Sequence, residues 1–136
     1  MKINLIVIRT DKPKKLSNFY ELLGMKFEYH QHGKGTWHYS TEIGGTVFEI
    51  YPLMKNQENP DKSLRLGFTI ENLDKTIDNL KKQNIEIVRE PKESEWGYFA
   101  IIKDLDGRKI ELKKKPAGNK RYAIPILVKE KNLKKY

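Results

Sequence analysis

The sequence predicts an α+β protein built from two βαβββ modules, and two observations lead to that prediction. The order of helix-like and strand-like patterns is the same in both halves of the 136-residue chain. The halves also end alike, on GGTVFEIYP and on DLDGRKIEL, which place Glu49 and Glu111 between apolar neighbours. Because side chains alternate along a strand, each glutamate points away from the face that its apolar neighbours share. We interpret the matched glutamates as the mark of a duplicated chain.

The first module is expected over residues 1–53. Its elements, in order, are a strand INLIVIR, a helix KPKKLSNFYELLG, and the strands MKFEYHQH, TWHYSTEI and TVFEIYP. The apolar face of the helix consists of Leu16, Phe19, Tyr20 and Leu23. Gly24 ends the helix, and glycine-containing turns at residues 33–35 and 44–45 separate the strands.

The second module is expected over residues 64–115, after a linker at 54–63 that is rich in Asn, Gln and Pro. It begins with the strand SLRLGFTI and the helix LDKTIDNLKKQN, and continues with the strands IEIVREP, WGYFAIIKD and RKIELKK. The helix turns Leu73, Ile77 and Leu80 inward. One module alone has exposed sheet edges, so we expect two modules to pair, either within one chain or across a homodimer.

Composition limits the classes of protein that the chain can represent. No apolar stretch approaches the length of a membrane span, and the apolar run in MKINLIVIRT is too short for a signal peptide, so we expect a cytoplasmic protein with no membrane partner. The chain has no cysteine, which excludes disulfides, thiolate nucleophiles and thiolate metal ligands. Chemistry would then depend on His, carboxylates, Tyr, Lys or a bound ion.

The net charge of +9 is concentrated at one end of the chain. Residues 1–112 hold 18 basic and 17 acidic residues, whereas residues 113–136 hold nine basic residues and Glu130. We interpret residues 116–136 as a solvated basic extension with an edge strand at YAIPILV. The alternative is an accessory protein that contacts an anionic surface through this tail, but no aromatic residues interleave with its lysines, which disfavours nucleic acid.

Several strings resemble one family in order and spacing: FYELLGMKF, FEIYP, IENLDKTIDNLKKQNIEI and DLDGRKIEL. Over residues 1–115 the chain resembles the vicinal oxygen chelate superfamily, which includes glyoxalase I, extradiol dioxygenases, and fosfomycin and bleomycin resistance proteins. The resemblance implies a cup-shaped, mostly antiparallel sheet with helices outside and a small-molecule pocket inside. In metal-dependent members, the first and last strands of each module supply the metal ligands.

Glu49 and Glu111 match the last-strand positions of that pattern, but the first-strand positions depart from it. They fall on Arg65 and on Leu5, or on Asn4 if the alignment slips by one residue. Arginine stays protonated and has no lone pair for a metal. We therefore expect Arg65 to lie between the two glutamates where a metal would carry its charge, with Arg9 on the same face. The alternatives are glutamates that face water and arginines in structural ion pairs.

The three histidines lie around one expected hairpin. His30 and His32 share a face of one strand and His38 follows on the next, so a metal site across the hairpin is geometrically feasible. The alternative is that they are exposed or hydrogen-bonded locally. With Trp37, His38 also lies in the aromatic string TWHYS, which forms either a pocket wall or core.

These observations support two further functional readings beside the basic-tail one. The first is a metal-free small-molecule-binding protein of the glyoxalase and bleomycin resistance type. Its expected ligand-binding residues are Arg9, Trp37, His38, Glu49, Arg65 and Glu111. The alternative is a divalent-metal-dependent lyase, isomerase or transferase that holds Mn, Ni, Fe or Zn on Glu49, Glu111 and His38.

Overall fold

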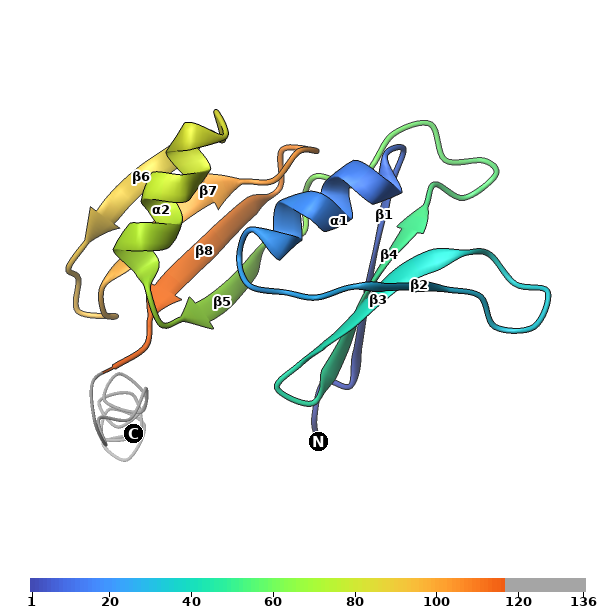
Figure 1. Cartoon of the computed structure of the whole chain (residues 1–136), viewed down its shortest axis with the longest axis horizontal. Helices are drawn as coiled ribbons and strands as arrows, with labels where there is room; N and C mark the ends of the chain where they lie inside the picture. Colours follow the sequence, from blue (N-terminus) through green and yellow to red (C-terminus); the bar gives the residue numbers. More distant parts are fainter. Residues whose placement is uncertain (117–136) are drawn as a thin grey trace, which may run out of the picture.

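The computed structural model describes residues 1–116 and confirms the α+β class. The first module contains β1 (Leu5–Thr10), α1 (Pro13–Glu21), β2 (Glu28–His30), β3 (His38–Ile43) and β4 (Thr46–Pro52) (Figure 1). The second contains β5 (Leu66–Ile70), α2 (Leu73–Lys82), β6 (Ile87–Lys92), β7 (Phe99–Lys103) and β8 (Lys109–Lys114). The βαβββ order therefore occurs twice, as predicted. Residues 117–136, with the expected edge strand YAIPILV, lie outside the described residues.

Each module forms its own four-stranded mixed sheet. The strand orders are β1-β4-β3-β2 and β5-β8-β7-β6, with a parallel pair between the first and last strand of each module and antiparallel pairs elsewhere. Within residues 1–116, no strand of one sheet pairs with a strand of the other. The resemblance implied one cup-shaped sheet, whereas the single chain forms two separate open sheets.

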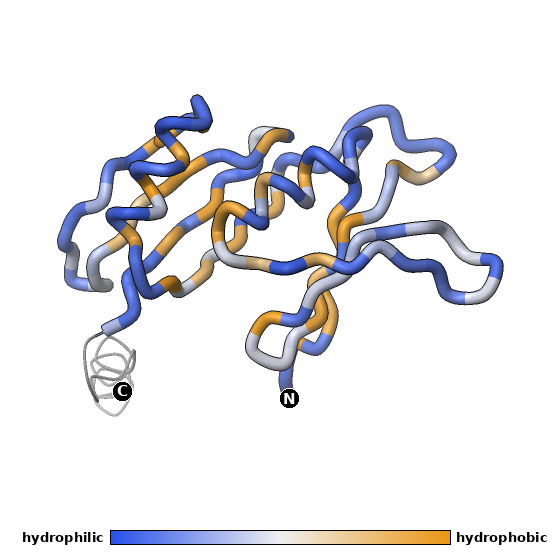
Figure 2. Tube along the Cα trace, viewed as in Figure 1, coloured by the Kyte–Doolittle hydropathy of each residue, from blue (hydrophilic) through white to orange (hydrophobic). Residues whose placement is uncertain are grey.

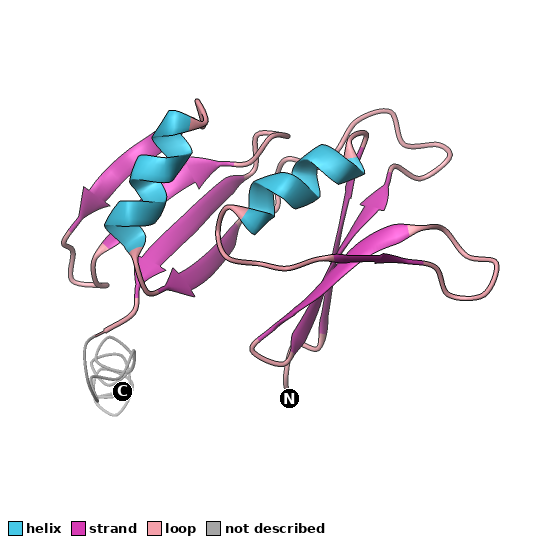
Figure 3. Cartoon of the chain, viewed as in Figure 1, coloured by secondary structure: helices cyan, strands magenta, loops and turns pink. Residues whose placement is uncertain are grey.

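The helices cover one face of each sheet and build a continuous apolar core (Figure 3). The inward faces of α1 and α2 are those the sequence predicts, with Leu16, Phe19, Tyr20 and Leu23 buried beside Leu73, Ile77 and Leu80. Phe68 of β5 lies 6.3 Å from the ring of Tyr20 and 6.2 Å from that of Phe48, measured between ring centroids. These aromatic contacts join the two modules through one core.

A buried polar cluster also joins the modules, centred on Arg108. Its Nη1 donates to Asp104 Oδ2 at 3.1 Å and to Asp106 Oδ2 at 2.9 Å, and its Nη2 donates to the Arg9 carbonyl at 2.7 Å. The Tyr20 hydroxyl donates to the same Asp104 Oδ2 at 2.8 Å. Because each buried charge has an opposite partner, the cluster avoids the cost of an unpaired buried ion.

No helix of residues 1–116 covers the opposite face of the first sheet. Along β1, Ile8 is buried while Leu5 and Val7 are 51% and 39% exposed, as their alternation predicts. Figure 2 shows hydrophobic residues on the strands of both sheets and mostly hydrophilic residues in the loop that joins the modules. Among the helices of residues 1–116, none is both long and apolar enough to cross a membrane.

Candidate functional site

The uncovered face of the first sheet carries a buried carboxylate. Strand register aligns Val7 of β1 with Glu49 of β4, and Glu49 with Ser40 of β3. Glu49 is only 8% exposed, although Val7 beside it on the same face is 39% exposed. A glutamate is rarely buried to this degree unless it has a partner. The partners of Glu49 come from the neighbouring hairpin.

His38 is the nearest partner of Glu49, and hydrogen bonds fix its orientation. Its Nδ1 lies 2.9 Å from the Thr36 carbonyl, which can only accept, so Nδ1 carries the proton and donates. Its Nε2 lies 3.0 Å from Glu49 Oε2. The Tyr51 ring stacks on the imidazole, with centroids 4.2 Å apart and an interplanar angle of 8°. Burial, and then the charge of Glu49, raise the pKa of Tyr51, while Arg9 lowers it.

His30 and His32 complete a compact group around this pair. Register places His30 opposite His38 across β2 and β3, and the three imidazole centroids lie 4.6 to 5.2 Å apart. The buried Nε2 of His30 lies 3.9 Å from Glu49 Oε2 and has no hydrogen-bond partner among residues 1–116. One potential ligand atom from each of the three histidines and Glu49 lies within 4.8 Å of the others. This is a set of nitrogen and oxygen donors that a divalent metal could use.

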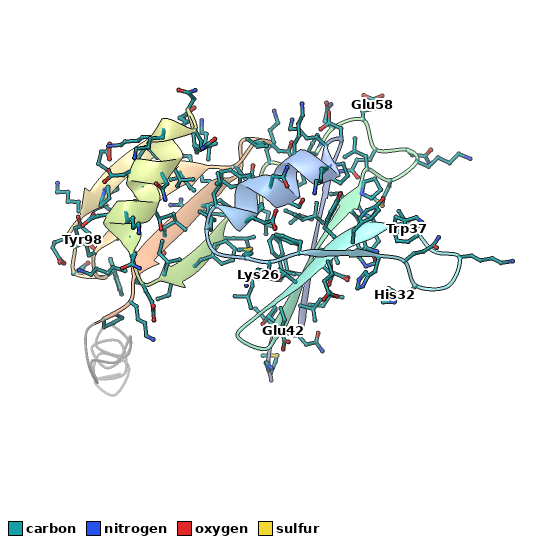
Figure 4. All side chains as sticks on the ribbon, in the orientation of Figure 1. Lys26, His32, Trp37, Glu42, Glu58 and Tyr98 are labelled. Carbon is teal, nitrogen blue, oxygen red and sulfur yellow. The ribbon has the colours of Figure 1, made fainter. Side chains whose placement is uncertain are left out.

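Trp37 does not lie on the face that carries His38. It is 48% exposed and stacks on Tyr29 with centroids 5.0 Å apart, and Tyr29 in turn lies 4.5 Å from Tyr39. Lys14 of α1 lies over Tyr39, so this aromatic stack belongs to the helix side of the sheet. Figure 4 shows Trp37 and His32 on opposite sides of the β2–β3 hairpin. Trp37 immediately precedes β3, and it lies with Tyr29 and Tyr39 rather than with His38.

Arg9 lies at the end of the same face as Glu49. Its Nη1 donates to the Pro52 carbonyl at 3.1 Å, and its guanidinium carbon lies 5.0 Å from the centre of the Tyr51 ring. These contacts hold the guanidinium beside the histidine group. Arg9, His38 and Glu49 are therefore gathered on one face of the first sheet.

Arg65 and Glu111 do not join them within the chain. Glu111 lies on β8 of the second sheet, where its side chain occupies the space beside Gly67. Arg65 is exposed just before β5, and no ion pair among residues 1–116 links it to Glu49 or to Glu111. The expected cluster of Glu49, Arg65 and Glu111 is not formed in the single chain, because the two sheets do not pair.

The same separation affects the expected metal set of Glu49, Glu111 and His38. His38 and Glu49 are in contact, but the side chains that gather with them are the imidazoles of His30 and His32 rather than the carboxylate of Glu111. Alternation along the strands placed His30 and His32 on one face. It did not reveal that Glu49 lies beneath them, because that depends on the register of three strands.

Comparisons with known proteins agree with this architecture. The family model described as Glyoxalase/Bleomycin resistance protein/Dioxygenase superfamily matches residues 2–112. The uncharacterized protein YetH of Bacillus subtilis is 36% identical over 70 residues, which are 50% of this chain and 57% of that relative. The chain thus spans just over half the length of this curated relative.

Solved structures show the same fold. TnmS3, an antibiotic binding protein from Streptomyces sp. CB03234, superposes with a TM-score of 0.67 at 22% identity, covering 85% of this chain and 97% of that one. TioX from Micromonospora sp. ML1 superposes with a TM-score of 0.64 at 14% identity, covering 84% and 98%.

Proposed function

Because the chain belongs to the Glyoxalase/Bleomycin resistance protein/Dioxygenase superfamily, we propose that it binds a small molecule against the uncovered face of its first sheet. The observation that carries the proposal is the buried Glu49 on an otherwise open face, with Arg9 and His38 beside it. A ligand site of this kind combines apolar surface with a few oriented polar groups. Leu5 and Val7 supply the exposed apolar surface here.

We further propose that the site is completed in a homodimer, where the first module of one chain faces the second module of its partner. The two uncovered faces have opposite charges. On the first sheet, register groups the acidic residues Glu28, Glu42 and Glu49. On the second sheet, it groups the basic residues Arg89, Lys103 and Lys113. Opposite potentials of this kind favour pairing of the two faces.

This arrangement would bring together the residues that the single chain keeps apart. Glu49 of one chain would face Arg65 of the partner subunit and Glu111 of the partner subunit across the ligand. Leu5 and Arg65 at the first-strand positions support binding without the catalytic metal arrangement of the superfamily's enzymes. The likeness to TnmS3, described as an antibiotic binding protein, supports an antibiotic-like aromatic molecule as the first ligand class to test.

The test combines oligomeric state with ligand binding. Analytical ultracentrifugation of the full chain should find a dimer, and Val7→Lys, which places a charge on the exposed apolar face, should give a monomer. Calorimetric titration with bleomycin and a panel of aromatic antibiotics should find one bound molecule per chain, lost in the variant. A monomeric wild-type protein would contradict the shared site. A dimer that binds none of the panel would contradict the ligand class.

A further inference from the structure

We propose that His30, His32, His38 and Glu49 form a Zn²⁺ site at the β2–β3 edge of the first sheet. The site uses one module alone and draws on two hairpin strands and β4. It differs from the metal set implied by the family resemblance, which needs both modules. The inference therefore does not depend on the proposed homodimer.

The donor geometry is close to that of a tetrahedral site. With zinc–ligand distances near 2.0–2.1 Å, donor atoms lie roughly 3.4 Å apart. In this structure the four donor atoms lie within 4.8 Å of one another, and His38 Nε2 and Glu49 Oε2 are already 3.0 Å apart. Side-chain rotations that move the donor atoms of His30 and His32 by roughly 1 Å would bring the four donors to that separation. Three imidazoles and a carboxylate also match the ligand preference of Zn²⁺.

His38 is already oriented as a metal ligand. A ligating histidine usually donates its second ring N–H to a carbonyl or carboxylate, which fixes the tautomer. Here Nδ1 pairs with the Thr36 carbonyl, which leaves Nε2 on the side of Glu49 Oε2, 3.0 Å away, and of the Tyr51 hydroxyl, 3.4 Å away. A metal cation between Nε2 and Oε2 would be coordinated by both atoms.

The imidazole of His30 supports the same zinc site. In the described part of the chain, the Nε2 atom of His30 is buried without a hydrogen-bond partner, and it faces Glu49 Oε2 at 3.9 Å. A buried polar atom without a partner is costly, and metal coordination would satisfy it. The chain contains only three histidines, and all of them lie in this group. His32 is exposed, so the ion can enter from the hairpin side.

The experiment uses the full chain purified without a histidine tag and freed of metal with a chelator. Calorimetric titration with ZnCl₂ should find one Zn²⁺ per chain, and saturating Zn²⁺ should raise the melting temperature by mass action. Co²⁺ added in its place should give the visible absorption of a tetrahedral complex. His32→Gln is the main variant, because His32 is exposed and its substitution leaves the core unchanged. It should weaken Zn²⁺ binding at least about tenfold.

Three further variants make the test decisive. Glu49→Gln and His30→Gln should weaken binding as His32→Gln does, while Glu111→Gln, on the other sheet, should leave the affinity unchanged. Lys113→Glu, which reverses a charge on the second sheet, should retain the zinc site even where it weakens the dimer, and this separates the inference from the proposed function. Equal Zn²⁺ affinity in wild type and His32→Gln would overturn the site. So would a loss of affinity in Glu111→Gln, which would favour the ligand set of both modules.

Discussion

Arg108 is the largest side chain that the fold buries completely, and its position explains how the modules are held. It pairs with Asp104 and Asp106 of its own turn and donates to the Arg9 carbonyl of the first module. Removing either member of a buried ion pair leaves an uncompensated charge, so this junction needs both the arginine and its aspartate partners. The string DLDGRK forms a turn in which the Gly107 N–H donates to the Asp104 carbonyl, and alternation alone cannot reveal that its charges point inward.

Tyr20 provides a test of this junction through pH. Burial, and then the charge of Asp104, raise the pKa of Tyr20 well above its ordinary value. The folded protein therefore keeps the phenol proton after the unfolded chain releases it at about pH 10. The contribution of the Tyr20 hydroxyl to the free energy of unfolding is complete below about pH 10, and it is lost as the pH rises toward the pKa of Tyr20 in the folded protein.

Tyr20→Phe should cost about 1.5–3 kcal/mol at pH 8, because the hydroxyl bond to a carboxylate is lost. Urea unfolding at pH 8 and pH 11 measures the free-energy difference between wild type and variant. That free-energy difference should be smaller at pH 11, because the Tyr20 hydroxyl of the wild type then stabilises the folded state less. A difference that stays constant with pH would mean that Tyr20 does not titrate on unfolding.

At the level of elements, both helices and most strand faces follow from periodicity. The inward residues of α2 recur at helical spacing, and β1 alternates as its apolar pattern predicts. The strand expected over MKFEYHQH is shorter than predicted, because only Glu28–His30 pairs with β3. Phe27 packs against the core, and Gly33 at φ +57° turns the chain into the hairpin. Local patterns cannot show where such a chain leaves the sheet.

Leu80→Ala tests how much α2 contributes to stability. Leu80 is fully buried, so the substitution leaves a cavity and should lower the free energy of unfolding by about 2–5 kcal/mol. Leu22→Ala is the matched control, since Leu22 is exposed after α1 and should cost under about 1 kcal/mol. Urea denaturation at neutral pH compares the two. Similar losses for both would mean that α2 does not close the core.

For the whole molecule, duplication of the pattern was enough to predict the fold but not the placement of the modules. Each module's strands and helix follow from local sequence. The modules meet through Tyr20, Phe68 and Arg108, which no periodic pattern connects. For the same reason the sequence could match Glu49 with Glu111 and Leu5 with Arg65 without showing that one chain keeps Glu49 apart from Arg65 and Glu111.

The charges of the two uncovered faces give a prediction for the assembled protein. Lys113→Glu reverses a charge on the basic face and should weaken the proposed dimer by roughly tenfold, or about 1.4 kcal/mol, at low salt. The effect should shrink at high salt because ions screen the pairing. Lys115→Glu, an equal change at an exposed residue paired with Glu71, is the control. Sedimentation at low and high salt measures the dimer affinity of the two variants. Equal affinity in Lys113→Glu and Lys115→Glu would rule out pairing through the basic face.

The grouping of every histidine beside Glu49 also makes the protein convenient to observe. Because the chain has only His30, His32 and His38, selective isotope labelling of histidine gives a spectrum with three imidazole spin systems. All three report on the same edge of the first sheet, with no background from elsewhere in the molecule. Nuclear magnetic resonance of such a sample would follow proton exchange, hairpin motion and ligand arrival at this edge residue by residue.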